Sequence, residues 1–568
     1  MATYTQAERP IAITTPLGKD VLLLNGCRGH ESISQLFHFD LDLLAEATED
    51  IKFDKILGQA VTIEIRLIND QKRYFNGIIR RFGQAGRGDE DFIQYTAELV
   101  PKIWLLTKNV QSRIFQHIAV PDILKKVFAG FDVTYEIAAA FKPRDYCVQY
   151  RESDFDFASR LMEEEGIYYF FKHTQSGHQM VITDSSSPVL PGLSTVIYEE
   201  VTGGVREDQR VLSWQKDQEI RSGELTLWDH CFELPGKNFE CKAKTVDSVT
   251  VGKVVHKLKV GGNDKLEIYD YPGGYAQRFD GVSKGGAPQP ADVQHIFEDG
   301  PRTTKIRMEQ ETVAGIDIRG KSNCGQFCPG FKFTLTRHFN ADGQYLLTRV
   351  EHDASLHGSF RSQGAMTFSY ENRFQCIPAA LRFRPQQVTR KPVISSIQTA
   401  LVVGPAGEEV FIDQYGRIKV QFYWDRQGKK DSDSSCWVRV AQFWAGKGWG
   451  AFFWPRIGQE VVISFEEGDP DQPLIVGSVY NGDNPPPWKL PDAKNFAGIK
   501  SASVHGNAAE NYNGILFVDE KGQEHVAIQS ERHLVINAEY DVSYNMGRHH
   551  GERVPAGKTL TVGRLPFT

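Results

Sequence analysis

Two cysteines and two histidines are the residues of this chain that come closest to a metal-binding set. Cys324 and Cys328 are close in sequence, and His338 and His352 follow them downstream. Thiolates and imidazoles are the ligands that zinc prefers, usually from two short Cys or His pairs. Because no second close cysteine pair accompanies this one, the spacing favours small buried residues at strand ends over a zinc site.

A run of acidic residues offers a second kind of chemistry. Glu163, Glu164 and Glu165 end a predicted helix that begins beside Asp154 and Asp156. Two carboxyl groups can serve as general acid and general base when they flank a substrate bond. Nothing in the sequence places a second acid or a nucleophile opposite the run. A charge run on a helix flank is typical of a solvated face, and we expect that here.

Other catalytic patterns give no better candidate. His30 and Glu31 begin the zinc-protease pattern H-E-x-x-H, but Ser34 takes the place of its second histidine. The adjacent His549 and His550 would point to opposite faces of a strand, so we expect them to be exposed. We expect neither a G-x-S-x-G nucleophile elbow nor a P-loop pattern to occur in the sequence. The sequence therefore predicts a protein that is no enzyme, with no catalytic residue, no cofactor and no metal.

Composition describes an ordinary soluble protein. Its 568 residues are enough for several domains, and 40% are hydrophobic and 24% charged. A net charge of −7 is small for this length and indicates neither a nucleic-acid nor an anionic-membrane partner. The eight cysteines lack framework spacing, which fits reduced thiols. The first ten residues show no signal-peptide pattern, so we expect folding in the cytoplasm and export without a signal peptide.

The elements before residue 400 are predicted to be mainly β. Alternating apolar residues predict strands over 21–44, 60–67, 74–82 and 92–100. Two helices interrupt them: one spans 121–129, and the second begins after Ser153, forms a capping box with Asp156 and ends at Gly166. Residues 200–390 are predicted to be β-rich, with a strand over 329–336 that pairs with 343–350. Prolines at 378, 385 and 392 then mark a linker.

A small barrel is predicted over residues 410–484. Five apolar segments separated by turns fit an OB-type barrel, namely 418–422, 436–440, 450–454, 460–465 and 474–479. Trp424, Trp437, Trp444, Trp449 and Trp454 lie in this region, and exposed rings beside a basic groove would bind single-stranded nucleic acid. Residues 411–480 carry eight basic and nine acidic side chains, however, so the rings are expected to fill a barrel core or a subunit interface.

The barrel also carries a specific signature. The run Asp413-Gln414-Tyr415-Gly416-Arg417 opens it, and the segments 418–425, 437–440, 448–450, 455–461, 468–473 and 477–481 continue it. This pattern resembles the VgrG family, which forms the tip of the bacterial type VI secretion apparatus and is similar to the hub and spike of contractile phage tails. The resemblance can be followed from about Glu31 to about Gln523. Its signature residues here are Asp413, Tyr415, Gly416, Arg417, Trp424, Trp437, Trp449, Pro455 and Gly458.

A repeat of eight residues follows the barrel. Ile528, Ile536, Tyr544 and Leu560 fall at multiples of eight, and the first three are preceded two positions earlier by Val526, Leu534 and Val542. Glu552 interrupts the series. Short strands with this period cannot bury their apolar face within one chain, so they need neighbours. Three identical chains wound together would supply these neighbours. The segment 560–563 resembles the Val-Gly repeats of VgrG needles, which are built in this way. A single-chain β-solenoid is the alternative.

The predicted fold is mainly β, with β-barrel hub domains, a few helices, an OB-fold barrel and a C-terminal intertwined trimeric β-shaft. The expected domains are a hub-like base (1–385), a linker (386–400), the barrel (401–484), a second linker (485–512) and the start of the shaft (513–568). About forty residues, 485–525, separate barrel and shaft, too few for an inserted lysozyme-like domain.

The resemblance implies a homotrimeric spike that punctures a target envelope and carries effectors. Its base would sit on an Hcp-like tube near baseplate proteins, and its shaft would carry a PAAR-like tip protein and effectors, some through adaptor chaperones. Neither nucleic-acid binding nor stable membrane insertion is expected. The alternatives are a phage-tail or other contractile-injection spike, an OB-fold nucleic-acid binder and a cell-wall hydrolase. The sequence names neither the effector nor the target cell.

Overall fold

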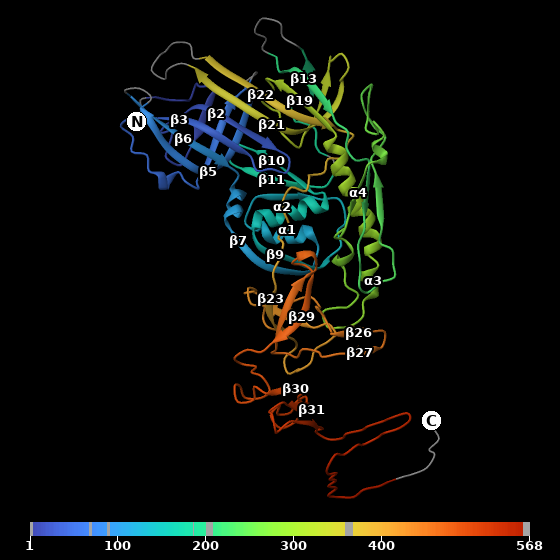
Figure 1. Ribbon diagram of the computed structural model, residues 1–568. Coiled ribbons are helices and arrows are strands. Elements are labelled where there is room, and N and C mark those ends of the chain that lie inside the picture. Colours follow the sequence, from blue (N-terminus) through green and yellow to red (C-terminus); the bar gives the residue numbers. More distant parts are fainter. Residues whose placement is uncertain are drawn as a thin grey trace. The chain divides into compact units, whose positions relative to one another are not determined.

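The computed structural model describes residues 4–67, 71–87, 91–185, 187–199, 208–357 and 367–560. Its internal contacts divide the chain into two compact units, Met1–Asn481 and Gly482–Thr568. The first unit is built mainly from β-strands with a few helices (Figure 1), as the sequence predicts, and the second contains three short strands. None of the helices in the described part of the chain has the length and apolarity of a membrane span.

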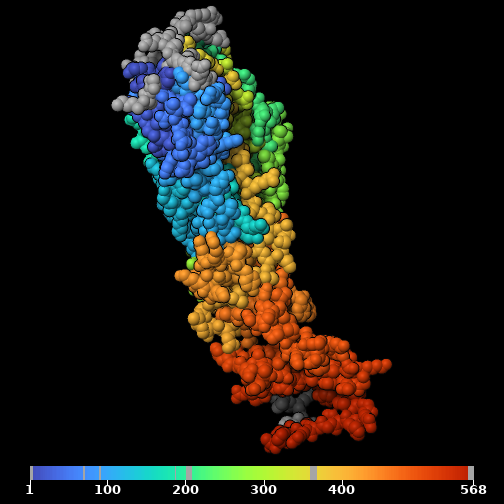
Figure 2. All heavy atoms as spheres, turned by 90° about the vertical axis from the view of Figure 1, so that its left-hand side faces the viewer, coloured from blue at the N-terminus to red at the C-terminus, as the bar shows by residue number. Residues whose placement is uncertain are grey.

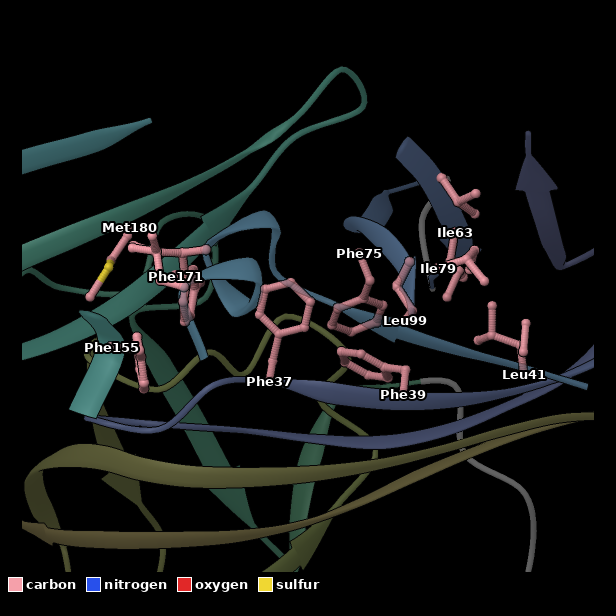
Figure 3. Close-up of a cluster of buried hydrophobic side chains, with 14 of the residues drawn as sticks. Phe37, Phe39, Leu41, Ile63, Phe75, Ile79, Leu99, Phe155, Phe171 and Met180 are labelled. Atoms are coloured by element: carbon pink, nitrogen blue, oxygen red, sulfur yellow. The ribbon is translucent and has the colours of Figure 1, made fainter. Parts of the chain in front are cut away.

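Six strands near the N-terminus form the first part of the base. They pair in the order β1-β4-β5-β6-β3-β2, and their bounds are Ile11–Thr14 (β1), Leu23–Ser32 (β2), His38–Glu46 (β3), Ala60–Arg66 (β4), Lys72–Arg87 (β5) and Phe92–Val100 (β6). Alternation along β3 buries Phe39 and Leu41 and exposes Asp40 between them. Figure 3 shows Phe39 beside Phe75 of β5 and Leu99 of β6, with Leu41 farther along β3. The strands predicted here are confirmed.

A closed barrel of six strands continues the same sheet. β2 pairs with β21, and the ring runs β21-β20-β12-β13-β19-β22 before β22 returns to β21. The bounds are Thr195–Tyr198 (β12), Arg210–Gln218 (β13), Ile316–Ser322 (β19), Lys332–Thr336 (β20), Gly343–His357 (β21) and Thr367–Pro378 (β22). β20 pairs antiparallel with β21, as predicted. A separate apolar core, with Phe327, Phe333 and Phe374, fills this barrel.

Two helices lie beside the strand pair β7 (Val110–Ile118) and β9 (Arg144–Ser153). They are α1 (Val120–Val127) and α2 (Asp154–Glu165), and β8 (Val133–Glu136), β10 (Tyr168–His173) and β11 (His178–Thr183) form a small sheet next to them. The Ser153 hydroxyl accepts a 3.0 Å hydrogen bond from the Asp156 backbone N–H, and Gly166 ends α2 with φ +67°. Both helices and the predicted cap are therefore confirmed.

The chain between β13 and β19 forms a further lobe with its own small core. Its strands are β14 (Glu224–Leu227), β15 (Cys241–Lys244), β16 (Ser248–Val251), β17 (Val254–Lys257) and β18 (Glu267–Asp270), and its helices are α3 (Pro290–Val293) and α4 (Ile296–Ala314). α4 was not predicted, because it has no side-chain cap and contains Pro301, which the sequence pattern treats as a helix breaker.

Five strands form the second barrel of the first unit. Their order is β24-β23-β28-β29-β25, and their bounds are Gln398–Val403 (β23), Lys419–Phe422 (β24), Arg439–Val440 (β25), Glu460–Phe465 (β28) and Pro473–Val479 (β29). A bridge between Ile418 and Val438 joins the two outer strands and closes the barrel. Its core includes Tyr146 and Val148 of β9, so barrel and base share buried surface. Figure 2 shows the barrel (orange) directly against residues near 110–130 (light blue).

One of the five predicted barrel strands is wrong. Residues 450–454 do not join the barrel sheet, because β26 (Trp444–Gly446) and β27 (Trp449–Ala451) pair only with each other as a hairpin. The fifth strand is β23, which begins inside the segment predicted to be a linker. Three glycines, at 446, 448 and 450, favour the tight hairpin, and local alternation alone does not reveal which strands pair.

The second unit is a small sheet followed by irregular chain. β30 (Phe496–Lys500), β31 (Gly514–Val518) and β32 (His525–Gln529) pair antiparallel in this order. Residues 530–560 carry no helix and no strand. Among the apolar residues described in this unit, Val518 alone is buried.

Candidate functional site

The signature run at 413–417 forms a tight turn in the second barrel. One oxygen of the Asp413 carboxylate accepts hydrogen bonds from the backbone N–H groups of Tyr415 (2.9 Å) and Arg417 (2.8 Å). Gly416 lies between them with φ +69°, and a Cβ on it would come within 2.4 Å of the Trp454 ring. Since this position needs both a left-handed backbone and free space, only glycine fits without strain.

Arg417 joins the barrel to the lobe between β13 and β19. Its side chain is 2% exposed; Nε donates to Asp413 (2.6 Å), and Nη1 and Nη2 donate to the two oxygens of Asp280 (2.6 and 2.9 Å). The Phe232 ring lies 4.9 Å from the guanidinium carbon. Burial alone would lower the pKa of Arg417, but hydrogen bonds and charge from Asp280 and Asp413 raise it above its ordinary value. Asp413 and Arg417 of the signature thus form, with Asp280 and Phe232, a buried charged contact between barrel and lobe, which we call the joint. The sequence did not indicate Asp280 or Phe232.

The remaining signature residues divide between the joint and the surface. The Trp437 indole N–H donates to the Ser283 carbonyl oxygen (2.8 Å), and the half-buried Trp424 donates to Gln398 (2.9 Å). Pro455 is buried, and Gly458 turns the chain with φ +90°. Trp449, in contrast, is 59% exposed on the hairpin. The aromatic residues of the barrel therefore do not share one role.

The acidic run at the end of α2 is largely buried, so the expectation that it forms a solvated face is wrong. Glu163 and Glu165 are buried, and Glu165 pairs with Arg144, Arg278 and Arg302. Burial alone would raise the pKa of Glu165, but these arginines lower it to about 2. Glu163 accepts hydrogen bonds from the backbone N–H groups of residues 388 and 389, which anchors the segment that leads to the barrel. The run is therefore structural, because Glu164 and Glu165 form ion pairs and Glu163 holds a neighbouring segment.

The sequence contains two short patterns that the prediction missed, one typical of a nucleophile elbow and one typical of a phosphate-binding loop. Residues 281–285 spell G-x-S-x-G, but Ser283 lies in a turn where its hydroxyl accepts the Ala287 N–H (3.1 Å), with no strand-to-helix elbow. Residues 315–322 spell the P-loop pattern, but 316–322 are strand β19, so their backbone cannot cradle a phosphate. The expectation that neither pattern occurs was wrong, yet neither forms its functional structure.

The cysteines and histidines considered for zinc have separate surroundings. Burial raises the pKa of both the Cys324 and Cys328 thiols to about 12. His352 instead contacts the buried Glu31 carboxylate (3.2 Å), which also pairs with Arg73 (2.7 Å). Within the described ranges, no group of three or more His, Cys, Asp and Glu side chains has a metal-site geometry. Glu31 therefore belongs to a buried ion pair, which its sequence position did not indicate.

The second unit has an apolar sheet face that this chain leaves uncovered. Register places Ile499, Ile515 and Ile528 in one cross-strand row and Ala497, Phe517 and Val526 in the next row of the same face. The large side chains of these rows are 41–62% exposed. Val526 and Ile528 belong to the predicted shaft core, whereas Ile499, Ile515 and Phe517 were missed, although alternation at 515 and 517 could have indicated the latter pair.

The other predicted shaft residues lie beyond β32. Leu534, Ile536, Val542, Tyr544 and Leu560 are 53–79% exposed. They lie in chain without regular secondary structure, so their role as a shared core stays a prediction. Residues 561–563, which complete the Val-Gly repeat, lie outside the described residues.

A base with a closed six-stranded barrel, a second, five-stranded barrel joined to it by buried charges, and a segment with an uncovered apolar face define a hub-and-spike assembly protein. Residues 30–358 match the family described as phage tail baseplate hub (GPD), and 410–480 match the type VI secretion system/phage-baseplate injector OB domain. The chain belongs to the VgrG family of type VI secretion system spike proteins.

Individual relatives support this assignment. The spike protein VgrG1a of Pseudomonas aeruginosa is 37% identical over 552 residues, covering 95% of this chain and 80% of that protein. The actin cross-linking toxin VgrG1 of Vibrio cholerae is 28% identical over 534 residues, and the match spans 91% of this chain and 45% of the toxin. A type VI secretion component of E. coli that resembles the T4 tail proteins gp27 and gp5 shares the fold (TM-score 0.52, 18% identity, covering 82% of this chain and 99% of that one).

Proposed function

We propose that three copies of this chain form a non-enzymatic spike at the tip of a type VI secretion apparatus. The observation that carries the proposal is the uncovered apolar face of β30, β31 and β32, continued by the exposed octad residues. Apolar faces of this kind are buried against neighbouring chains in soluble proteins. A three-fold arrangement closes a core around one axis, and repeats with this period need such neighbours.

The mechanism is mechanical. Intertwined strands pair their backbone groups between chains, so an applied force is shared over many hydrogen bonds and few strand edges stay open. Contraction of the apparatus would drive the spike through a target envelope without a membrane-spanning segment in the spike itself. The protein is assembled in the cytoplasm and leaves the cell with the apparatus.

The proposed partners are those that the resemblance to the family implies. The base contacts an Hcp-like tube and baseplate proteins, and the shaft end carries a PAAR-like tip protein and effectors, some through adaptor chaperones. A relative that is named as a toxin supports the idea that spikes of this family deliver effectors. A phage-tail or other contractile-injection spike is the alternative with the same physics.

The solution mass of the full chain tests the trimer. Light scattering across a range of concentrations is expected to give three times 64.0 kDa. The variant Ile515→Ser/Phe517→Ser/Ile528→Ser removes apolar side chains from the uncovered face and is expected to dissociate. The matched control His525→Ser/Gln529→Ser changes exposed polar residues of the same sheet and should stay trimeric. A monomeric wild-type protein at all concentrations would refute the proposal.

A further inference from the structure

Two histidines lie opposite each other on the outer face of the base. His30 of β2 and His38 of β3 are direct partners in the antiparallel register, and their ring centroids are 6.3 Å apart. Side chains that face each other across two strands point to the same face of the sheet. His30 begins the H-E-x-x-H pattern that Ser34 interrupts, so the neighbouring strand, and not the sequence pattern, places a second histidine beside it.

A carboxylate orients one of the two rings. Asp40 lies two residues after His38 on the same face of β3, and its Oδ1 atom is 3.0 Å from the His38 Nε2 atom. Because a carboxylate only accepts hydrogen bonds, Nε2 carries the proton of the neutral ring and Nδ1 keeps a lone pair. Among the described residues, none forms a hydrogen bond with this Nδ1 atom or with the His30 ring. A metal-binding histidine typically donates its other ring N–H to a carboxylate in this way.

The histidine pair borders a hollow of about 370 Å³ that contains more carboxylates than arginines. Figure 1 shows β3, β2 and β21 side by side, and Glu351 of β21 lies opposite His30 in the register. Four carboxylates and three arginines line the hollow. Two of these arginines already pair with lining carboxylates, Arg28 with Asp353 (3.2 Å) and Arg349 with Glu351 (3.0 Å). The remaining charge is slightly negative, which favours a bound cation.

The two rings need only a small movement to share one metal ion. Zinc binds imidazole nitrogen at about 2.0–2.1 Å with tetrahedral geometry, which brings the centroids of two bound rings to roughly 5 Å. The observed separation of 6.3 Å exceeds this by only about 1 Å. The His38 side chain is 25% exposed, and surface side chains change rotamer rapidly, so the gap can close without movement of the strands. Imidazole suits zinc, copper and nickel, whereas magnesium and calcium prefer oxygen ligands.

We propose that His30 and His38 bind a divalent transition-metal ion of the zinc type, and that Asp40 is a positioning residue for the His38 ring. The chain supplies two nitrogen ligands, and water fills the other coordination positions. The ion links β2 to β3 beside the pairing of β2 with β21, through which the first six strands continue into the closed barrel. This site goes beyond the proposed spike function, and it does not depend on the number of chains in the assembly.

Chemical modification of histidines in the full-length protein locates the site. Diethyl pyrocarbonate modifies free imidazoles, and mass spectrometry measures the rate at each histidine. Zinc chloride at about ten times its dissociation constant should slow modification of His30 and His38 roughly tenfold, and magnesium chloride should have no effect. The exposed His533 of the second unit is the internal control and should react at an unchanged rate. Unchanged rates at the pair would overturn the proposal, and so would equal slowing at His533, which means adventitious binding only.

Calorimetric titration with zinc chloride tests each role. His30→Gln/His38→Gln should lose this binding, and undiminished binding would contradict the proposal. Asp40→Asn should weaken it roughly 10–100-fold, because the carboxylate that fixes the His38 ring is lost, and Asp40→Glu should restore most of the affinity. Asp42→Asn removes an exposed carboxylate farther along the same face of β3 and should leave the affinity unchanged. Equal effects of the two asparagine variants would refute the positioning role of Asp40.

Discussion

Replacing Arg417 by methionine would leave two buried carboxylates without their cation. Asp280 is 8% exposed and Asp413 is 7% exposed, and the substitution removes three hydrogen bonds from the guanidinium while keeping most of the side-chain volume. Breaking a buried ion pair by removing one partner costs about 3–5 kcal/mol. The equilibrium for opening the joint between barrel and base should therefore rise roughly a hundred- to several-thousand-fold, at about 1.4 kcal/mol per tenfold change.

Native-state hydrogen exchange measures this opening locally, which suits a chain too large for a single unfolding equilibrium. Peptides from 413–422 should exchange faster by that factor in Arg417→Met, whereas peptides from β5 and β6 should not change. The control Arg426→Met removes an exposed hydrogen bond from the barrel to Gln111 of the base (3.0 Å), which contributes about 1 kcal/mol.

The double variant Arg417→Met/Asp280→Asn tests whether Arg417 and Asp280 stabilise the joint together. Neutralising Asp280 removes one of the stranded charges, so the double variant should be less destabilised than the sum of the two single variants. Additive effects, or less than fivefold faster exchange in Arg417→Met, would show that Arg417 is not the joint described here.

Two further predictions concern the turn and the acidic network. Gly416→Ala should destabilise the barrel by roughly 2 kcal/mol or more, because the new Cβ would sit on a left-handed backbone and clash with Trp454. The control Gly407→Ala, with φ +86° and open space, should cost only about 1 kcal/mol. Equal losses of stability in the two variants, measured by hydrogen exchange, would contradict this. The folded-state pKa of Glu165 is about 2, below its ordinary 4.5, so its stabilisation is present above pH 4.5 and is lost as the pH falls toward 2. Thermal melting at several pH values should therefore show a smaller acid-induced loss in Glu165→Gln than in the wild-type protein, and parallel losses would rule out this role.

Local signals in the sequence were sufficient where the structure depends on neighbouring residues. Ser153, Asp156 and Gly166 specify both ends of α2 because a cap and a left-handed terminus need only a few adjacent positions. The burial of Glu165 could not be read in the same way. Its partners Arg144 and Arg302 come from β9 and α4, and only the tertiary fold brings those segments together.

The barrel signature shows a similar limit. The resemblance identified Arg417 and Asp413, and their spacing of four residues is visible in the sequence. Asp280, which accepts two of the three guanidinium hydrogen bonds, is 137 residues away. No local pattern marks it, because a single aspartate in a loop is a common surface residue. The same limit hid α4, whose apolar face follows no strong period and whose Pro301 suggests a break.

The distribution of buried apolar residues differs sharply between the two units. Four apolar cores lie within the first unit, whereas Val518 is the one buried apolar side chain among the described residues after 481. Ordering a residue costs about 1–2 kcal/mol of backbone entropy, and one buried valine offsets only a few kcal/mol. Strands β30 to β32 therefore cannot be stable in an isolated chain through apolar burial. In the proposed trimer, we therefore expect their folding to be coupled to association, so that dissociation and loss of this sheet occur together.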